Sequence, residues 1–221
     1  MGGILKSTWE MLHDGRFLKK ALMIACPVAL QGMLNTIVNM VDTLMIGGLG
    51  STAIAAVGLA NKVFFVFSLL VFGIVSGGGI LAAQFWGSGD VKNIRKVLGL
   101  CVMLAMVGAM FFVVPALTAP RMVMRIFTTS EGSIELGAKY LRIAALSYPF
   151  IALTNVYVAM LRATNKVVFP VICSCIAIAI NICLNYVLIF GKFGAPTMGV
   201  AGAACATLTA RCIEVTLELF Y

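Results

Sequence analysis

The feature that most constrains this chain is a series of apolar segments, each long enough to cross a bilayer as an α-helix. They cover roughly residues 18–45, 54–83, 97–119, 140–161, 167–190 and 198–220. A helix needs about 20 residues to cross about 30 Å of hydrocarbon, whereas a membrane β-strand shows about 10 residues of alternating polarity. With 62% hydrophobic and 11% charged residues, the chain carries more apolar surface than a soluble fold could bury. We therefore predict an all-α membrane protein, a bundle of six transmembrane helices spanning 18–221.

The basic residues are distributed unevenly between the two sides of this predicted bundle. With a cytoplasmic N-terminus, the inner side receives Lys6, Arg16, Lys19, Lys20, Lys92, Arg95, Lys96, Arg162 and Lys166. The outer loops receive mainly Arg121, Arg125 and Lys192. This positive-inside pattern predicts a multi-pass protein of the plasma (inner) membrane with both termini cytoplasmic and 1–17 as a cytoplasmic or interfacial segment. The net charge of +8 then reflects topology and lipid contact, and we expect no nucleic-acid partner.

The sequence offers little for metal or covalent chemistry. The seven cysteines lie within predicted helices without any CxxC spacing, and the single histidine, His13, lies in the N-terminal segment. There is no HExxH motif, and Asp42 lacks the second acid of an aspartyl dyad. We therefore expect neither an enzyme nor a bound cofactor.

Polar residues form a stripe along the first predicted helix. Gln31, Asn35, Asn39 and Asp42 follow one another at steps of four, four and three, which places them on one helical face. Asp42 is the only charged residue between positions 21 and 61. Polar and ionisable groups within membrane helices turn towards protein or a water-filled cavity, so this stripe predicts a site inside the bundle.

Three other predicted helices carry polar groups that could meet this stripe. Helix five contributes Asn181 and Asn185 at a spacing of four. Helices four and six contribute Tyr148, Thr154, Asn155, Tyr157, Thr207 and Thr209. If these helices surround one cavity, their oxygens suit Na⁺, and a lone buried carboxylate suits a proton. The alternative is that the amides and hydroxyls only hydrogen-bond neighbouring helices.

Two further features concern helices one and six. Pro27 removes a backbone donor and frees the carbonyl of Met23, which predicts either a hinge or a static kink. Arg211, Glu214 and Glu218 lie in the second half of helix six, where we expect them to mark its exit into the interface.

A weak internal similarity links the first and fifth helices. VDTLMIG resembles LNYVLIFG, and this alignment places Asp42 opposite Asn185. Transporters are often built from repeats with polar sites between them, so the similarity is compatible with a transport protein.

Several stretches in order resemble the multidrug and toxic compound extrusion family, MATE. They are the proline of helix one, VDTLMIGGLG, AAVGLA, GIVSGGG, AAQFWGSGD, IFTTSEG, YLRI, LRATNK with Pro170, NICLNYVLIFG and MGVAGAACAT. The resemblance begins at about Leu18 and covers nearly the whole chain.

The resemblance implies half of a twelve-helix transporter, namely the N-terminal lobe of an antiporter that exchanges H⁺ or Na⁺ for organic, often cationic, drugs. It implies that Asp42, Asn181, Asn185 and Thr207 form the cation-coupling site, with a possible Na⁺ at Asp42. Some branches of the family have aspartate at the position of Asn185, so the amide argues against a two-carboxylate Na⁺ site here. Gln31, Asn35, Asn39, Tyr148 and Asn155 would support the site or line the substrate cavity, and Pro27 would be the hinge.

Two other functions are compatible with these segments. A lipid-linked oligosaccharide flippase of the same superfamily would need several cations in its cavity to hold pyrophosphate, and the predicted helix interiors hold almost none before Arg211. The chain could also be a membrane fragment without transport activity. We expect a fragment that works with a missing C-terminal lobe, rather than a natural half-transporter that pairs with a second copy.

Overall fold

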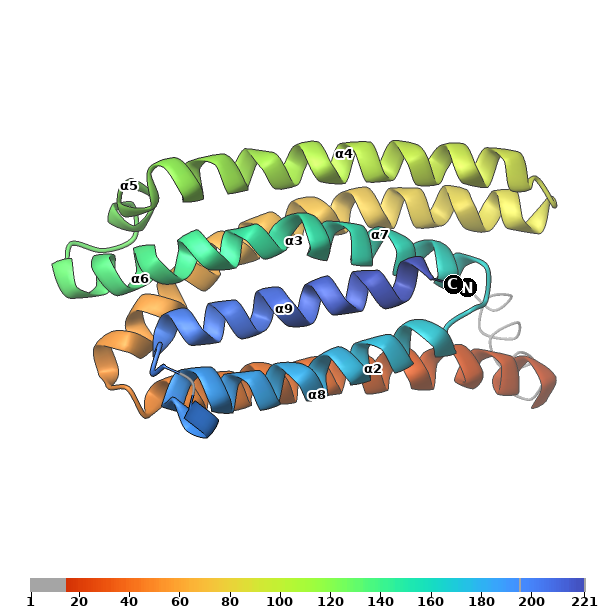
Figure 1. Cartoon of the computed structure of the whole chain (residues 1–221). Helices are drawn as coiled ribbons and strands as arrows, with labels where there is room; N and C mark the ends of the chain where they lie inside the picture. The colour runs from red at the N-terminus through yellow and green to blue at the C-terminus, as the bar shows by residue number, and fades with distance from the viewer. Residues whose placement is uncertain (1–14, 195, 221) are drawn as a thin grey trace, which may run out of the picture.

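The computed structural model describes residues 15–194 and 196–220, so the segment predicted over 1–17 lies almost wholly outside the described residues. The described chain folds into an elongated bundle of helices that run along one common direction (Figure 1). The long helices are α2 (Gly15–Gly47), α3 (Ser51–Gly87), α4 (Val91–Thr118), α6 (Glu131–Ala144), α7 (Tyr148–Ala163), α8 (Val168–Phe190) and α9 (Val200–Leu219). The prediction of an all-α membrane protein is confirmed.

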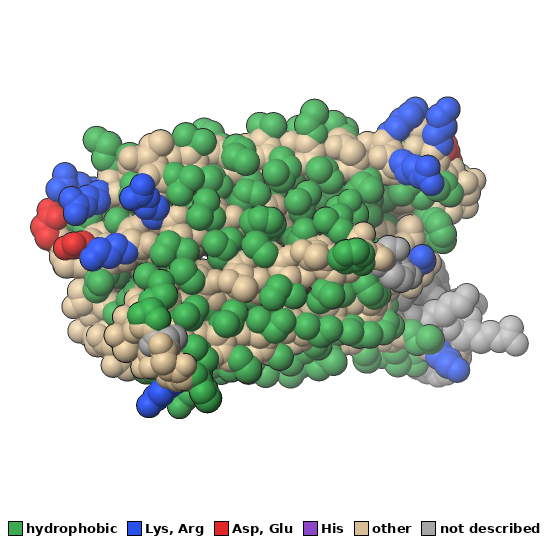
Figure 2. Space-filling model, viewed as in Figure 1, with side chains coloured by type: hydrophobic (Ala, Val, Ile, Leu, Met, Phe, Trp, Pro, Cys, Tyr) green, Lys and Arg blue, Asp and Glu red, His purple; other side chains and the backbone are tan. Residues whose placement is uncertain are grey.

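Membrane-spanning character follows from helix length and composition. Within the described residues, five helices are long and apolar enough to cross a bilayer: Ser51–Gly87, Val91–Thr118, Glu131–Ala163, Val168–Phe190 and Val200–Leu219. The first predicted span corresponds to α2, which is not one of these five but lies beside α8 (Figure 1). Apolar side chains cover the middle of the visible face, and Lys and Arg gather at its two ends (Figure 2). That distribution fits a hydrocarbon layer around the middle of the bundle.

The fourth predicted helix is longer than the sequence indicated. A short helix, α5 (Pro120–Arg125), follows α4, and α6 begins at Glu131 rather than near 140. A 3₁₀ turn, η1 (Ala145–Ser147), joins α6 to α7, because the following Pro149 cannot donate a backbone hydrogen bond. Lys139 and Arg142 therefore lie on α6.

The helices pack as two groups with α7 and α9 central. The larger apolar core lies among α3, α4, α6 and α7, and is centred on buried residues such as Phe67, Leu141 and Val156. A smaller core around Ile46 and Ile189 joins the ends of α2 and α8 to the start of α9. This packing places the polar faces of α2, α8 and α9 next to one another.

Candidate functional site

Two hydrogen bonds join the polar stripe of α2 to α8. Gln31 Nε2 donates to Ser174 Oγ at 2.7 Å, and Asn185 Nδ2 donates to Asp42 Oδ1 at 2.5 Å. Both bonds connect residues 143 positions apart, so α2 and α8 run parallel in one fixed register. The polar stripe of α2 therefore faces protein.

One set of polar residues, the Asp42 cluster, consists of Asp42, Asn181, Asn185 and Thr207. Asn185 Nδ2 also donates to Asn181 Oδ1 at 3.1 Å, and Asn181 Nδ2 donates to Thr207 Oγ1 at 3.5 Å. Asn185 is fully buried, and its Oδ1 has no hydrogen-bond partner among the described residues. The structure thus brings together all four residues to which the sequence assigned cation coupling. One carboxylate with amide and hydroxyl oxygens is a donor set for a proton or Na⁺.

Close contact between α8 and α9 positions Asn181 against Thr207. A Cβ on Gly202 would lie 2.7 Å from both the carbonyl carbon and the carbonyl oxygen of Leu188. Only glycine allows the two backbones to approach this closely. Thr207 Oγ1 donates to the Ala203 carbonyl at 3.0 Å, which fixes the hydroxyl on the side of α9 that faces α8.

The Asp42 cluster lies at a cavity of about 1010 Å³. Its walls come from α2, α6, α7, α8 and α9, and also from α3 through Asn61, Phe64 and Ser68, which the sequence had not indicated. The predicted residues that line it are Gln31, Asn35, Asn39, Asp42, Tyr148, Asn155, Asn181 and Thr207. Asn185 does not line the cavity and lies behind Asp42. Much of the lining is apolar or aromatic, as in other small-molecule sites.

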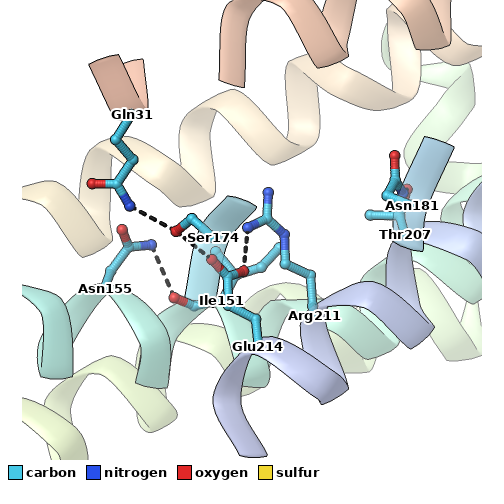
Figure 3. Close-up of polar contacts among 8 residues, drawn as sticks. All are labelled: Gln31, Ile151, Asn155, Ser174, Asn181, Thr207, Arg211 and Glu214. Atoms are coloured by element: carbon cyan, nitrogen blue, oxygen red, sulfur yellow. Dashed lines mark hydrogen bonds and ion pairs between the residues drawn. The ribbon is translucent and has the colours of Figure 1, made fainter. Parts of the chain in front are cut away.

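The predicted supporting residues differ in their surroundings. Tyr148 is buried and stacks on Phe67, with ring centroids 4.7 Å apart and an interplanar angle of 9°. Asn155 Nδ2 donates to the Ile151 carbonyl of its own helix at 2.9 Å (Figure 3). Asn39 is exposed and Asn35 is half-buried, so these two amides face the open part of the cavity.

A second set, the Glu214 cluster, was not predicted as a site and consists of Gln31, Arg162, Ser174, Arg211 and Glu214. Ser174 Oγ donates to Glu214 Oε1 at 2.7 Å, and Arg211 Nη1 donates to Glu214 Oε2 at 2.6 Å (Figure 3). Arg162 Nη2 donates to Gln31 Oε1 at 2.6 Å. The bonds link α7, α2, α8 and α9 through side chains alone.

Of Arg211, Glu214 and Glu218, which were expected to mark the exit of helix six into the interface, two are buried within the bundle. Glu214 is only 1% exposed and Glu218 only 4% exposed. The steps from Thr207 to these three residues are four, three and four, so all share the face of α9 that packs inside the bundle. This spacing is the signal that could have identified the Glu214 cluster.

Arg211 is the member of the Glu214 cluster that also interacts with the Asp42 cluster. It lies one turn after Thr207 and about one turn before Glu214, and it interacts electrostatically with Asp42 as well as pairing with Glu214. The cavity wall therefore holds an internal cation close to the carboxylate that was predicted to bind an external one. A positive charge near Asp42 competes with any other cation for that carboxylate.

Comparison with known proteins gives consistent matches. The family model described as MatE matches residues 27–187. The chain is 33% identical over 195 residues to "Probable multidrug resistance protein NorM" of Thermotoga maritima, covering 87% of this chain and 42% of that protein. It is 32% identical over 204 residues to "Probable multidrug resistance protein YoeA" of Bacillus subtilis, covering 88% and 42%. The chain thus spans less than half the length of these relatives.

Solved structures share the fold. An outward-facing conformation of a multidrug resistance MATE family transporter of the MOP superfamily superposes with a TM-score of 0.83 at 23% identity, over 91% of this chain and 44% of that one. An inward-facing conformation of such a transporter superposes with a TM-score of 0.76 at 23% identity, over 91% and 45%. At this level of identity the likeness concerns the architecture of the six-helix unit.

Proposed function

Because the chain belongs to the MatE family, we propose that it forms the N-terminal lobe of a cation-coupled multidrug antiporter in the plasma (inner) membrane. The exported compounds would be small organic cations. A complementary lobe, either a C-terminal half or a second copy, would supply the opposite wall of the cavity. Relatives that carry multidrug resistance names and are more than twice as long support this proposal.

The observation that carries the proposal is the position of Asp42 at the wall of a cavity of about 1010 Å³. Its carboxylate accepts a hydrogen bond from a neutral amide, Asn185, and a cation that binds it would compete with the nearby Arg211. Two cations cannot share one partly buried carboxylate cheaply. Binding of H⁺ or Na⁺ would therefore displace a cationic drug, and this competition would couple the two movements.

Transport in liposomes tests this proposal. The complete transporter would be reconstituted with a fluorescent organic cation, and a pH gradient and a Na⁺ gradient would be applied separately. We expect gradient-dependent flux with one of the two ions, and none from the 221-residue chain alone, because a single lobe provides one wall of the cavity. Flux that does not depend on either the pH gradient or the Na⁺ gradient would contradict cation coupling. Robust flux from the 221-residue chain alone would favour a pair of half-transporters.

A flippase for a lipid-linked oligosaccharide is the second candidate, because Arg162 and Arg211 both line the cavity. Each guanidinium already donates to a side chain of this lobe, Arg162 to Gln31 and Arg211 to Glu214, which leaves less capacity for pyrophosphate. Offering the organic cation and a pyrophosphate-linked lipid to the same vesicles distinguishes the two functions. Movement of the anionic lipid without the cation would favour the flippase.

A further inference from the structure

The last turns of α9 hold a carboxylate that the Asp42 mechanism does not use. Glu218 is 4% exposed, and among the described residues neither of its carboxylate oxygens has a hydrogen-bond partner. It follows Glu214 by one helical turn and shares its face of α9. Buried carboxylates normally hold several hydrogen bonds or an ion pair, so this arrangement requires an explanation.

A second group without a partner lies next to it. Thr154 on α7 is 7% exposed, and its Oγ1 is also buried without a hydrogen-bond partner among residues 15–194 and 196–220. Its hydroxyl lies close to the Glu218 carboxylate but without the geometry of a hydrogen bond, and it also lines the cavity. A hydroxyl can donate and accept, whereas an ionised carboxylate can only accept. Thr154 can donate to the ionised carboxylate, but it can accept a hydrogen bond from Glu218 only when the carboxyl group carries a proton, which also removes the buried charge.

Among the described residues, the recorded ion pairs do not include Glu218. On α9 its charged neighbours are Glu214, which repels it, and Arg211, which already donates to Glu214 at 2.6 Å. On α8 the thiol of Cys173 lies near both glutamates. Glu214 Oε1 and Oε2 are engaged by Ser174 and Arg211 respectively, so Glu218 faces a carboxylate that is already paired.

We propose that Glu218 is a second proton-binding site of this lobe, separate from Asp42, and that Thr154 is the hydrogen-bond partner of the bound proton. A proton from water in the cavity adds to the Glu218 carboxylate and gives a neutral carboxylic acid, and the reverse step returns it. The neutral acid avoids the cost of a buried charge without hydrogen bonds. A hard metal cation would need about six oxygen ligands, more than Glu218 and Thr154 provide.

The position separates this site from the Asp42 cluster. Thr207 belongs to that cluster, and Glu218 lies eleven residues further along α9, about 16 Å at 1.5 Å per residue. The inference rests on the burial of these two side chains and does not depend on the proposed drug export. A failure to observe transport would not contradict the proton site at Glu218. Failure to find the proton site would likewise not contradict the proposed drug export.

Infrared spectroscopy of the chain in detergent or lipid tests the proposal, because a protonated carboxyl group has a C=O stretching band that an ionised one lacks. We expect one such band at neutral pH that shifts in D₂O and persists in Asp42→Asn. Glu218→Gln should remove it, and Glu135→Gln, which alters an exposed ion pair with Lys139, should not.

A second variant, Thr154→Val, leaves Glu218 in place, so its result does not depend on whether Glu218→Gln folds. Thr154→Val is close in shape and removes the hydroxyl, so the band should remain but move to higher frequency as the acid loses a hydrogen bond. Absence of the band in the unmodified chain at neutral pH, or its persistence in Glu218→Gln, would overturn the proposal. An unchanged frequency in Thr154→Val would overturn the assigned partner.

Discussion

Asn185 donates a hydrogen bond of 2.5 Å to Asp42, and these are the two residues that the internal similarity of the sequence aligns. The two segments are weakly similar in sequence and lie side by side in space, because two hydrogen bonds join α2 to α8 at a constant separation of 143 positions. One member of the pair keeps a charge and the other is neutral. Asp42 is thus oriented by its counterpart without being neutralised by it.

The first prediction concerns Asp42→Asn in the complete transporter. The substitution keeps size and hydrogen-bonding capacity and removes the charge, so gradient-driven efflux of an organic cation should fall to background. Folding should be retained, because the cost of holding a carboxylate among apolar side chains disappears. Liposome flux and membrane expression measure the two effects.

Glu131→Gln is the matched control, because it changes an exposed acid that pairs with Arg125 at 3.2 Å. It should leave flux unchanged. If Asp42→Asn exports drug normally and keeps its response to the ion gradient, Asp42 is a structural residue and the coupling mechanism is wrong.

The second prediction concerns Glu214→Ala, which removes the acceptor of both Ser174 and Arg211. Breaking a buried ion pair by removing one partner leaves the other uncompensated, so the free energy of unfolding should fall by about 3 kcal/mol. Thermal unfolding of the chain in detergent measures this loss. Glu131→Ala breaks a pair whose side chains are 63% and 77% exposed and should cost under about 1 kcal/mol. Equal losses would show that the Glu214 cluster does not stabilise the bundle.

The third prediction concerns the contact between α8 and α9. Gly202→Ala places a Cβ 2.7 Å from the Leu188 carbonyl, so the helices must separate, at a cost of about 1–3 kcal/mol. Gly58→Ala is the control, because a Cβ there meets nothing within 4 Å. It should be neutral or stabilising by about 0.5–1 kcal/mol. Unfolding measured on both variants of this chain compares them directly, and a Gly202→Ala variant as stable as Gly58→Ala would contradict the close packing.

The fourth prediction concerns topology. On a background without the native cysteines, Glu131→Cys should react with an impermeant thiol reagent added from outside, and Lys92→Cys should react only after the membrane is opened. Position 131 begins α6, and position 92 lies at the start of α4, at the opposite end of the bundle (Figure 1). The reverse labelling pattern would place the termini outside.

Periodicity within single helices predicted much of the candidate site. The stripe from Gln31 to Asp42 and the pair Asn181 and Asn185 follow from steps of three and four, because these steps define a helical face. Thr207 was one of two helix-six threonines that could meet the stripe, and the family resemblance assigned it to the coupling site. The predicted convergence of these residues agrees with the geometry, although their role in coupling remains a prediction.

For the Glu214 cluster, the spacing on α9 was a weaker signal than the α2 stripe. The polar residues of α9 also follow one another at steps of three and four, but charged residues near the end of an apolar segment are equally typical of an interface. Ser174 is one small polar residue among many, and its role depends on the register between α2 and α8. Arg162 lies near a helix end, yet its long side chain reaches Gln31. Register and side-chain reach are properties of the packed bundle.

The two hydrogen bonds between α2 and α8 also determine which part of α2 is free to move relative to α8. Pro27 lies one turn before Gln31, outside the stretch held by the bonds at Gln31 and Asp42. An apolar cavity of about 530 Å³ adjoins Pro27 and gives a bend room to develop. Bending at this proline would therefore move the part of α2 that starts at Gly15, while Asp42 stays hydrogen-bonded to Asn185. Pro27 would then be the point of bending, Asp42 would stay in place, and the end of α2 that starts at Gly15 would move.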